Sequence, residues 1–367
     1  MRIGIDVHVL NGPAQGSASL LSTLLRSFPT GNEYFLYSFA PAETRSLFPD
    51  PRFVHRRIRI RQPHIRIQLL YPLLTHRDRC DVFHAQYYGP LFGTSALVLT
   101  IHDVIYLDFP RFAPWIRRWQ VRTLGRMCAR AASQIITDSR YCKERIVHHY
   151  GVQPERVTVV YGALDRTWLE PDEKAIAQAW SGLKGSLPNR YVLGVGRMDP
   201  RKNFVLNGRI TRRLQSLGLT DGLVLVGPDD FGAQAIKTQL RRDGLDSLVV
   251  RLIGLTATQI QAVYRHAQCL LFLSLAEGFG LPPLEAMAMG TPVVASNRTS
   301  IPEVCGRGAV IVNPDDEAAV FRSCRLVMND LQLRDALVAR GHEWVQGFRA
   351  DRMVADVLEV YRKAVGK

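Results

Sequence analysis

Short, almost wholly apolar runs alternate with longer segments of helical length along most of the chain. The run from Ala96 to Ile101 is typical of a strand covered on both faces, so the pattern predicts a parallel sheet between layers of helices. Segments 17–28, 114–131 and 140–149 are long enough for the crossover helices of such a sheet. The strands predicted in this half are 2–10, 34–39, 53–60, 81–85, 96–102, 134–138 and 157–161.

The alternation stops after Asp165 and restarts at Tyr191. The segment between them has no clear strand and holds several chain-breaking residues, which indicates a region between domains: Pro171, Gly182, Gly185 and Pro188. Residues 316–365 are predicted to be helical. The strands predicted in this half are 191–196, 222–227, 248–253, 269–274, 292–296 and 309–313.

This pattern predicts an α/β protein with two successive βα domains, whose strands direct their carboxyl ends toward a cleft. We expect a first domain at 1–165, a second at 166–345, and a C-terminal helix at 346–367 that packs back toward the first domain. The length of 367 residues suits two such domains.

Composition narrows the class of protein. Hydrophobic residues make up 47% and charged residues 22%, which excludes a disordered chain. No apolar run approaches the roughly 18 to 20 residues of a membrane span, and Asp6 inside the first apolar stretch favours a strand over a signal peptide. The six scattered cysteines form no C-x-x-C pair, so we expect a reducing cytoplasm with neither a zinc site nor a disulfide framework.

The net charge of +14 is concentrated in the first half, where residues 1–165 hold 21 Lys and Arg against 12 Asp and Glu. This excess favours an anionic partner, which could be a nucleic acid, an acidic membrane surface or a phosphorylated substrate. Arginine alternates with apolar residues over 52–61, as in a strand with one cationic face. Segment 115–122 mixes tryptophan with arginine on a predicted helix, a pattern typical either of a helix on an anionic membrane or of a solvated charged face.

A first motif, from Gly194 to Asn203, leads from a strand into a helix. Backbone N–H groups at a helix start, together with Arg197 and Lys202, would suit a diphosphate, and Gly196 gives the backbone room to approach it. The same glycines could also serve only as a turn. The two cations would neutralise the charge that grows on a leaving diphosphate.

A second motif, from Glu277 to Pro292, follows another apolar strand. Two glycines flank Phe279 just before a helix that begins with proline, so backbone donors are exposed beside a ligand. Carboxylates such as those of Glu277 and Glu285 accept hydrogen bonds from vicinal hydroxyls, which fits a sugar and a ribose. Alternatively, Glu285 could act only as a partner of the helix dipole.

In this order the two motifs resemble those of the family-4 glycosyltransferases, and bacterial mannosyltransferases in particular, over nearly the whole chain. The resemblance implies a GT-B fold, in which two Rossmann-like, doubly wound domains face each other across a cleft. It also implies that Arg197 and Lys202 contact the donor diphosphate, while Glu277 holds the sugar hydroxyls and Glu285 the ribose. Two further sets would bind the donor: backbone at Gly278, Phe279, Gly280 and Leu281, and, at the nucleobase, Gly254 and Leu255.

Matches to the family continue in the first half. His102 occupies the family's His-Asp position near the anomeric carbon, whereas Asp103 could simply cap a helix. Ser139 matches a site that lines the cleft, and a plain helix cap is the alternative there. Gly16 matches a glycine of the donor-binding loop, but Ser17 stands where the family has arginine. A second departure is the turn that usually reads P-N-G-V-D in the family. Residues 160–165 read V-Y-G-A-L-D here, and Ala163 stands in place of the family's glycine.

The resemblance implies retention of the anomeric configuration without a metal ion or other cofactor, and the sequence has no D-x-D triplet. We expect a GDP-mannose-like donor, with a UDP-sugar such as UDP-glucose as the alternative. The acceptor would be a glycan or lipid-linked sugar of polysaccharide or O-antigen synthesis, reached in the cytoplasm or peripherally at the inner membrane face. A basic nucleic-acid-binding protein is the alternative from another class. A dehydrogenase is disfavoured because the first glycine loop is not G-x-G-x-x-G.

Overall fold

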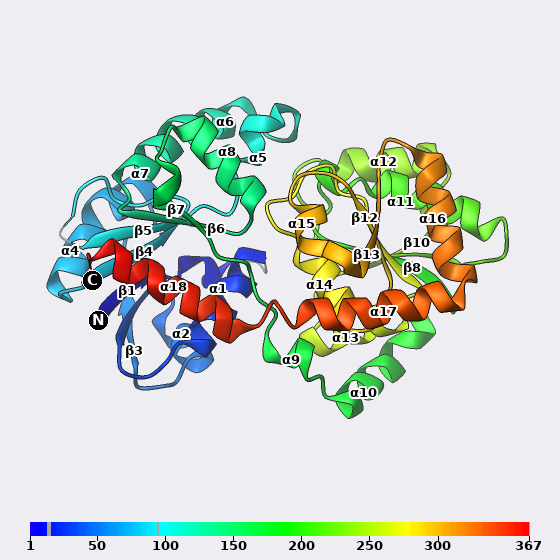
Figure 1. Ribbon diagram of the computed structural model, residues 1–367, viewed down its shortest axis with the longest axis horizontal. Coiled ribbons are helices and arrows are strands. Elements are labelled where there is room, and N and C mark those ends of the chain that lie inside the picture. Colours follow the sequence, from blue (N-terminus) through cyan, green and yellow to red (C-terminus); the bar gives the residue numbers. More distant parts are fainter. Residues whose placement is uncertain (13–15, 94, 367) are drawn as a thin grey trace. The chain divides into compact units, whose positions relative to one another are not determined.

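The computed structural model describes residues 1–12, 16–93 and 95–366 (Figure 1). The chain forms two compact units. Unit 1 comprises Met1–Ala163 together with Ala350–Lys367, and unit 2 comprises Leu164–Arg349. Each unit contains one parallel sheet flanked by helices, which is the two-domain α/β architecture expected from the sequence.

The sheet of unit 1 has the strand order β3-β2-β1-β4-β5-β6-β7, and every pairing is parallel. Ile3 of β1 lies between Tyr34 of β2 and Val82 of β4, all three fully buried. The strands are β1 (Arg2–Asp6), β2 (Glu33–Ser38), β3 (Phe53–Arg57), β4 (Val82–Gln86), β5 (Ala96–Thr100), β6 (Gln134–Thr137) and β7 (Val157–Val159).

Helices cover both faces of this sheet. Residues 63–77 and 115–131 each form a helical stretch interrupted by one π-helical turn, η2 (Arg66–Leu70) in the first and η4 (Val121–Gly125) in the second. The α-helices are α1 (Gly16–Ser27), α2 (Pro41–Leu47), α3 (Pro63–Ile65), α4 (Tyr71–Arg77), α5 (Ile105–Asp108), α6 (Trp115–Gln120), α7 (Arg126–Ala131), α8 (Arg140–Tyr150) and α18 (Ala350–Ala364). The short 3-10 turns are η1 (His8–Asn11), η3 (Pro110–Phe112) and η5 (Pro154–Arg156).

The last helix, α18, returns to unit 1, where it packs on α1 and on the sheet at β5 and β6 (red in Figure 1). Its apolar face joins the core cluster that contains Ile3 and Phe28. The hydroxyl of Tyr361 lies 2.7 Å from Nδ1 of His84 on β4, and both residues are buried. A chain segment far away in sequence therefore completes the core of unit 1.

The sheet of unit 2 has the order β10-β9-β8-β11-β12-β13, again wholly parallel. Its strands are β8 (Tyr191–Val195), β9 (Gly222–Val226), β10 (Val249–Leu252), β11 (Cys269–Phe272), β12 (Val293–Ser296) and β13 (Ala309–Val312). Its helices are α9 (Arg166–Leu169), α10 (Glu173–Leu183), α11 (Phe204–Gln215), α12 (Ala233–Arg242), α13 (Ala257–His266), α14 (Leu281–Ala288), α15 (Ile301–Cys305), α16 (Glu317–Asn329) and α17 (Leu331–Val345). The 3-10 turns are η6 (Lys184–Ser186), η7 (Pro200–Lys202), η8 (Asp246–Leu248) and η9 (Gly306–Gly308).

Every strand range predicted from the sequence overlaps an observed strand, but 2–10 and 53–60 run three or more residues past the observed strand ends. β1 ends at Asp6 because its carboxylate accepts a hydrogen bond from the backbone N–H of His8 and turns the chain. β3 ends at Arg57 because its neighbour β2 ends at Ser38, whose carbonyl accepts the N–H of Ile58 as the last ladder bond.

Candidate active site

In unit 2 the strand order reverses between β8 and β11, which lie side by side at the centre of the sheet. The chain proceeds from β8 to one edge of the sheet and from β11 to the other. In doubly wound sheets, ligands bind outside the carboxyl ends of the strands at this reversal point. Both motifs singled out in the sequence follow these two strands, so the topology brings them together.

The contact that joins the two motifs is an ion pair. Nζ of Lys202 lies 2.6 Å from Oε1 of Glu277, and the side chains are only 12% and 9% exposed. Burial would raise the pKa of Glu277, but the charges of Lys202 and Arg201 outweigh it and hold that pKa below its ordinary value. Glu277 is therefore ionised at neutral pH and acts as a hydrogen-bond acceptor, with Oε1 already engaged by Lys202.

The position of Lys202 depends on the glycine turn after β8. Gly196 has a φ of 142°, and a Cβ there would lie 2.7 Å from Cε of Lys202. A side chain at this position would displace the lysine as well as strain the backbone. The turn therefore requires glycine in order to place a cation at the end of the strand.

Arg197 and Arg201 have different environments. Arg197 is half-exposed and forms a 2.9 Å ion pair with Asp230. Arg201 pairs with Asp199 and donates to the carbonyl of Ala276, while its own carbonyl accepts the N–H of Leu275. Arg201 thus fixes the loop before Glu277, and Arg197 stays the more accessible cation.

Two residues after β12 hold the loop that carries Glu277. The hydroxyl of Thr299 accepts the backbone N–H of Glu277 at 2.9 Å. Ser300, fully buried, donates to the carbonyls of Glu277 and Phe279. Thr299 has a φ of 51°, a conformation that is strained for a β-branched residue and is often found at functional sites.

Helix α14 begins directly after this loop. Its N-cap, Gly280, has a φ of 111° and provides no side-chain cap. The next residues are Leu281, Pro282 and Pro283, and the two prolines have no N–H group. The predicted backbone donors at the start of the helix are therefore limited to Gly280 and Leu281.

Glu285 lies on the first turns of α14, and its environment differs from that of Glu277. Oε2 accepts a 2.7 Å hydrogen bond from the buried hydroxyl of Tyr264 on α13. Burial raises the pKa of Glu285 to about 7, against the opposing effects of the Tyr264 hydrogen bond and of Lys202. The two carboxyl groups of the motif therefore have different protonation behaviour.

The residues predicted at the nucleobase, Gly254 and Leu255, follow β10 at the carboxyl edge of the same sheet. Gly254 has a φ of 75° and open space around it.

In unit 1, His102 follows β5 with an oxygen atom at each ring nitrogen. Nδ1 lies 2.7 Å from Oδ2 of Asp138, and Nε2 lies 3.0 Å from Oε1 of Gln86. Burial lowers the pKa of His102, but the carboxylate of Asp138 outweighs it, so the net shift is upward. Acceptors on both sides favour the imidazolium form.

The remaining predicted residues of unit 1 have structural partners. Ser139 is fully buried and caps α8 by accepting the N–H of Cys142, and Asp103 accepts the N–H of Ile105. Gly16 is exposed at the start of α1, while Pro13, Ala14 and Gln15 of the same predicted loop lie outside the described residues. Contacts of these residues with a donor stay a prediction.

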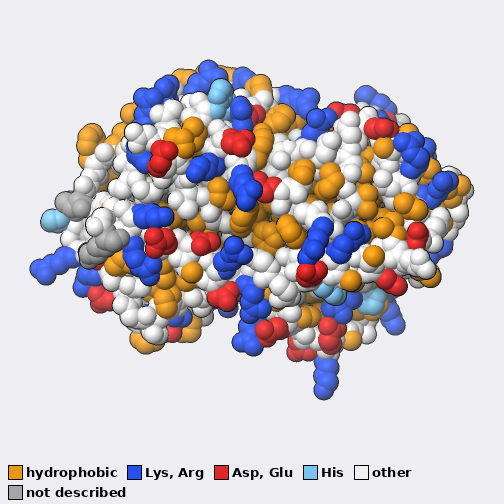
Figure 2. All heavy atoms as spheres, viewed as in Figure 1, with side chains coloured by type: hydrophobic (Ala, Val, Ile, Leu, Met, Phe, Trp, Pro, Cys, Tyr) orange, Lys and Arg blue, Asp and Glu red, His pale blue; other side chains and the backbone are white. Residues whose placement is uncertain are grey.

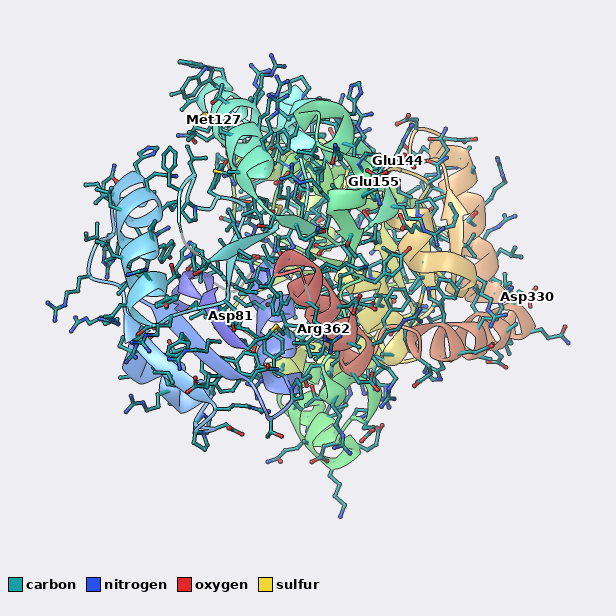
Figure 3. All side chains as sticks on the ribbon, turned by 60° about the vertical axis from the view of Figure 1, so that its left-hand side comes forward. Asp81, Met127, Glu144, Glu155, Asp330 and Arg362 are labelled. Atoms are coloured by element: carbon teal, nitrogen blue, oxygen red, sulfur yellow. The ribbon has the colours of Figure 1, made fainter. Side chains whose placement is uncertain are left out.

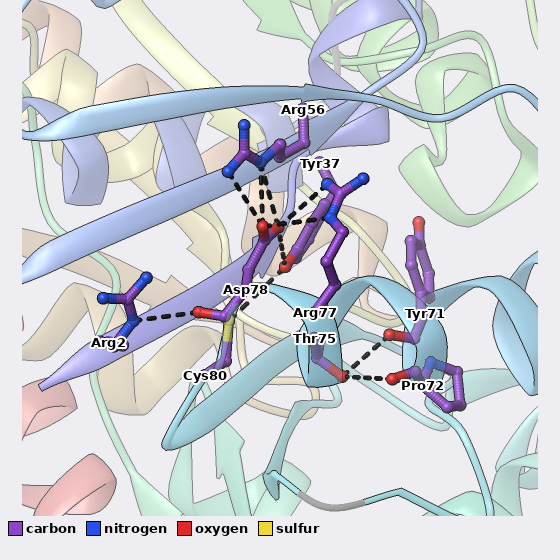
Figure 4. A network of polar contacts seen from close by, with 9 residues as sticks. All are labelled: Arg2, Tyr37, Arg56, Tyr71, Pro72, Thr75, Arg77, Asp78 and Cys80. Atoms are coloured by element: carbon purple, nitrogen blue, oxygen red, sulfur yellow. Dashed lines mark hydrogen bonds and ion pairs between the residues drawn. The ribbon is translucent and has the colours of Figure 1, made fainter.

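The cationic face predicted for segment 52–61 is smaller than expected. Arg56 points inward to the buried Asp78, to which it donates at 3.1 and 3.2 Å, and Tyr37 donates to the same carboxylate (Figure 4). Arg57, Arg59 and Arg61 are exposed. Arg56, whose side chain is 36% exposed, is therefore held by a buried carboxylate, and three arginines remain for a surface role.

The sequence did not reveal four residues of these sites. Gln86 ends an apolar strand at the carboxyl edge, as the motif residues do, so the same reasoning could have found it. Thr299 and Ser300 follow β12 but belong to no motif. Tyr264 lies inside an amphipathic helix, where an aromatic residue normally indicates only packing.

The chain was compared with known proteins. Residues 4–168 match the family model described as "Glycosyltransferase Family 4", and residues 189–330 match the one described as "Glycosyl transferases group 1". The O-antigen chain mannosyltransferase RfbU of Salmonella typhimurium is 28% identical over 70% of this chain, and that match covers 66% of RfbU, slightly under two thirds. The O-antigen chain mannosyltransferase B of Escherichia coli is 27% identical over 75% of this chain and 74% of its own length.

The fold has relatives among solved structures. Anabaena HepE, crystallised with UDP-glucose, superimposes with a TM-score of 0.77 at 19% identity, covering 98% of both chains. No helix in the described part of the chain is both long and apolar enough to cross a membrane. With the two family models matching its two halves in order, the chain belongs to the family-4 glycosyltransferases.

Proposed function

We propose that the protein is a retaining, metal-independent hexosyltransferase that transfers mannose or a related sugar from a GDP-sugar to a glycan or lipid-linked acceptor. The observation that carries this proposal is the set of groups at the β8 and β11 ends of unit 2. There a little-exposed cation, Lys202, contacts an ionised carboxylate, Glu277, close to the N–H groups that begin α14. These groups match the diphosphate and the hydroxyls of a nucleotide-sugar.

The proposed step breaks the bond between the anomeric carbon and the diphosphate oxygen. A bond from the acceptor oxygen forms on the same face, and the acceptor proton passes to the departing phosphate. Lys202 and Arg197 would neutralise the charge that develops on the diphosphate, which replaces a metal ion in this role. Both cations are paired with carboxylates, so binding of the donor must exchange these contacts for contacts with phosphate oxygens.

The mannosyl donor is supported by the two O-antigen mannosyltransferases among the relatives. We extend their pathway, synthesis of a bacterial surface polysaccharide, to this chain as part of the proposal. The alternative donor is a UDP-sugar, supported by the UDP-glucose in the structure of HepE. His102 is proposed to act near the anomeric carbon, as the resemblance implies.

A donor screen tests the choice of nucleotide. Ligands that bind only the native state raise its melting temperature, so GDP-mannose should raise Tm more than UDP-glucose or an ADP-sugar. Transfer should then be measured with the stabilising donor before and after treatment with EDTA, and an unchanged rate is expected. NMR of the product should show the same anomeric configuration as the donor, and an inverted linkage would refute the proposed step.

The site of action is proposed to be the inner face of the cytoplasmic membrane, with peripheral attachment through unit 1. Trp115 and Trp119 on α6 are 68% and 57% exposed, and Met127 on the outer side of α7 is 49% exposed (Figure 3). Aromatic residues interleaved with arginine are typical of helices that lie on anionic membranes.

A further inference from the structure

Unit 1 contains a cavity of about 370 Å³ at the reversal point of its own sheet. The strand order reverses between β1 and β4, and residues at and just after the ends of both strands line the cavity: Asp6 and His8 from the first, Gln86, Tyr87 and Tyr88 from the second. Its sides come from the two helical stretches 63–77 and 115–131. The cavity is thus where a doubly wound domain binds a ligand.

The backbone around the cavity is irregular in three places. Both π-helical turns supply lining residues, Arg66 and Gln68 from η2 and Leu124 from η4. π-helical turns are rare, and they occur frequently at functional sites. Tyr87 has a φ of 59°, which a bulky residue rarely adopts, and its ring lies 5.3 Å from that of His102. Strained or irregular backbone that clusters around one cavity is typical of a binding site, because it costs stability.

Arg66 is the unusual side chain of this cavity. It is only 7% exposed, yet its Nε has no hydrogen-bond partner, and its guanidinium forms no ion pair with any described residue. It stacks over the ring of Phe39, at 5.2 Å, and its charge partly offsets the rise in the pKa of the Tyr71 hydroxyl that burial causes. A buried charge without a partner is costly, and it persists where a ligand supplies the opposite charge.

Asp6, the acidic residue of the lining, does not pair with Arg66. Oδ1 of Asp6 accepts both the backbone N–H of His8, at 3.1 Å, and its ring Nδ1, at 2.7 Å. Gln68 is also engaged, since it accepts the N–H of Leu91 and donates to the carbonyl of Gly89. Arg66 is therefore the permanent cation of the lining, and its Nε is available to an incoming anion.

We propose that this cavity binds the acceptor and that the acceptor carries a phosphate ester, which pairs with Arg66. The planar guanidinium can donate two parallel hydrogen bonds to a phosphate. Tyr87, 37% exposed, offers a ring face to the sugar, and its contact with His102 connects the cavity to the residue expected near the anomeric carbon. This inference rests on the proposed function and specifies its acceptor class.

The test measures binding of three acceptor probes to the whole protein without donor. The probes are mannose 1-phosphate, a short-chain polyprenyl diphosphate-linked mannose in detergent, and uncharged methyl α-mannoside. We expect the phosphorylated probes to bind and the uncharged one to bind at least tenfold more weakly. Binding of the monoester indicates a free sugar phosphate as the acceptor, and binding of the polyprenyl probe alone indicates a lipid-linked one. Equal binding of all three would overturn the proposal.

Variants assign the effect to Arg66. Arg66→Met should weaken binding of the phosphorylated probes about 10- to 100-fold, as expected for loss of a charge-assisted hydrogen bond. Arg66→Lys keeps the positive charge, so its affinity for the phosphorylated probes should fall less than that of Arg66→Met. Arg45→Gln removes an equal charge from an exposed site of the same unit and should have no effect. The proposal is wrong if Arg66→Met, folded by circular dichroism, behaves like Arg45→Gln.

Donor binding separates this inference from the proposed function. GDP-mannose should stabilise wild type and Arg66→Met equally, because Arg66 lies in unit 1 and the donor motifs lie in unit 2. If no nucleotide-sugar binds while mannose 1-phosphate still depends on Arg66, the proposed function fails and the anion site stands. If the donor binds and the affinity for the phosphorylated probes does not depend on Arg66, the proposed function stands and the anion site is refuted.

Discussion

In the proposed donor site, the ion pair of Lys202 and Glu277 orders both side chains through one contact. At 2.6 Å and little exposed, each charge compensates the other in the absence of ligand. A ligand that brings phosphate to the lysine and hydroxyls to the carboxylate can replace this contact at low cost. Under the proposed function, the ion pair would preorganise both groups for the donor.

The first prediction concerns this pair. Lys202→Met leaves Glu277 buried and uncompensated, and Glu277→Gln does the same to the lysine, so each should destabilise the fold by about 3 kcal/mol or more. The double variant Lys202→Met/Glu277→Gln should recover much of that loss, because no buried charge remains. Urea denaturation of the four proteins gives the coupling energy.

Activity should not follow stability in that series. Each single variant should lower kcat/KM about 100-fold or more, and the double variant should stay inactive although it is more stable. Arg209→Gln, which breaks an exposed pair with Asp243, is the matched control and should change neither quantity measurably. Additive losses of stability would show that the two residues are not coupled.

The second prediction concerns Glu285, whose pKa of about 7 is set by burial. Ribose hydroxyls donate to a carboxylate, so the donor should bind better to the ionised form. The affinity for GDP-mannose should then rise about tenfold between pH 6 and pH 8, with release of a proton on binding near pH 7. Calorimetry in buffers of different ionisation enthalpy measures this proton.

Glu285→Gln should remove both the pH dependence and the proton release. Tyr264→Phe removes the hydrogen bond that lowers the pKa of Glu285, so it should move the pH midpoint upward. A wild-type affinity that is flat from pH 6 to pH 8 would contradict the assignment of Glu285 to the ribose.

The sequence identified the charged residues at these strand ends but not the residues that hold them. Glu277 and Lys202 belong to motifs, and a charge directly after an apolar strand is a strong signal. Tyr264, Thr299 and Ser300 act only through contacts made in the folded chain, at separations of about twenty residues from their partners. The pairing of Arg197 with Asp230 was also not predictable, since both residues lie in loops after different strands.

At the scale of elements, apolar runs predicted the strands well because parallel strands are buried on both faces. Helix interruptions were harder to predict. Segment 114–131 looked like one helix, and the π-helical turn at Val121–Gly125 has no signature in its composition. Similarly, the helical range 316–365 is divided into three helices, with a break at Asp330, which caps α17, and another before Ala350.

The third prediction concerns α18. His84 lies between the hydroxyls of Tyr361, at 2.7 Å, and Thr100, at 2.6 Å, and burial with the nearby charge of His102 lowers its pKa to about 3. Tyr361→Phe leaves a ring nitrogen of His84 buried without a partner and should cost about 1 to 3 kcal/mol of unfolding free energy. Urea denaturation of the whole protein measures this loss.

Tyr361→Ala should cost more, about 3 to 5 kcal/mol, because it also leaves a cavity in the core of unit 1. The control on the same helix is Arg362→Ala, whose half-exposed side chain pairs with Glu359 and should contribute less than about 1 kcal/mol. If Tyr361→Phe is no less stable than Arg362→Ala, the buried hydrogen bond does not anchor the helix.

At the scale of the whole molecule, both halves of the chain carry a positive excess, +9 over residues 1–165 and +5 over the remainder. Figure 2 shows Lys and Arg side chains interspersed with acidic ones over the face in view. A dispersed field of this kind steers the protein toward anionic surfaces, while local groups decide which part of it makes contact. The exposed arginines at the end of β3 and just after it, together with the tryptophans of α6, are the local groups expected to make this contact.

The fourth prediction tests that contact with vesicles. The protein should sediment with vesicles that contain phosphatidylglycerol and not with pure phosphatidylcholine, and added salt should release it. Each basic residue near such a surface contributes about 1 kcal/mol, so Arg57→Gln/Arg59→Gln should weaken binding roughly 30-fold. The control Arg241→Gln/Arg242→Gln removes the same charge from exposed positions of unit 2. If both double variants lose affinity equally, net charge alone drives binding and unit 1 has no membrane face.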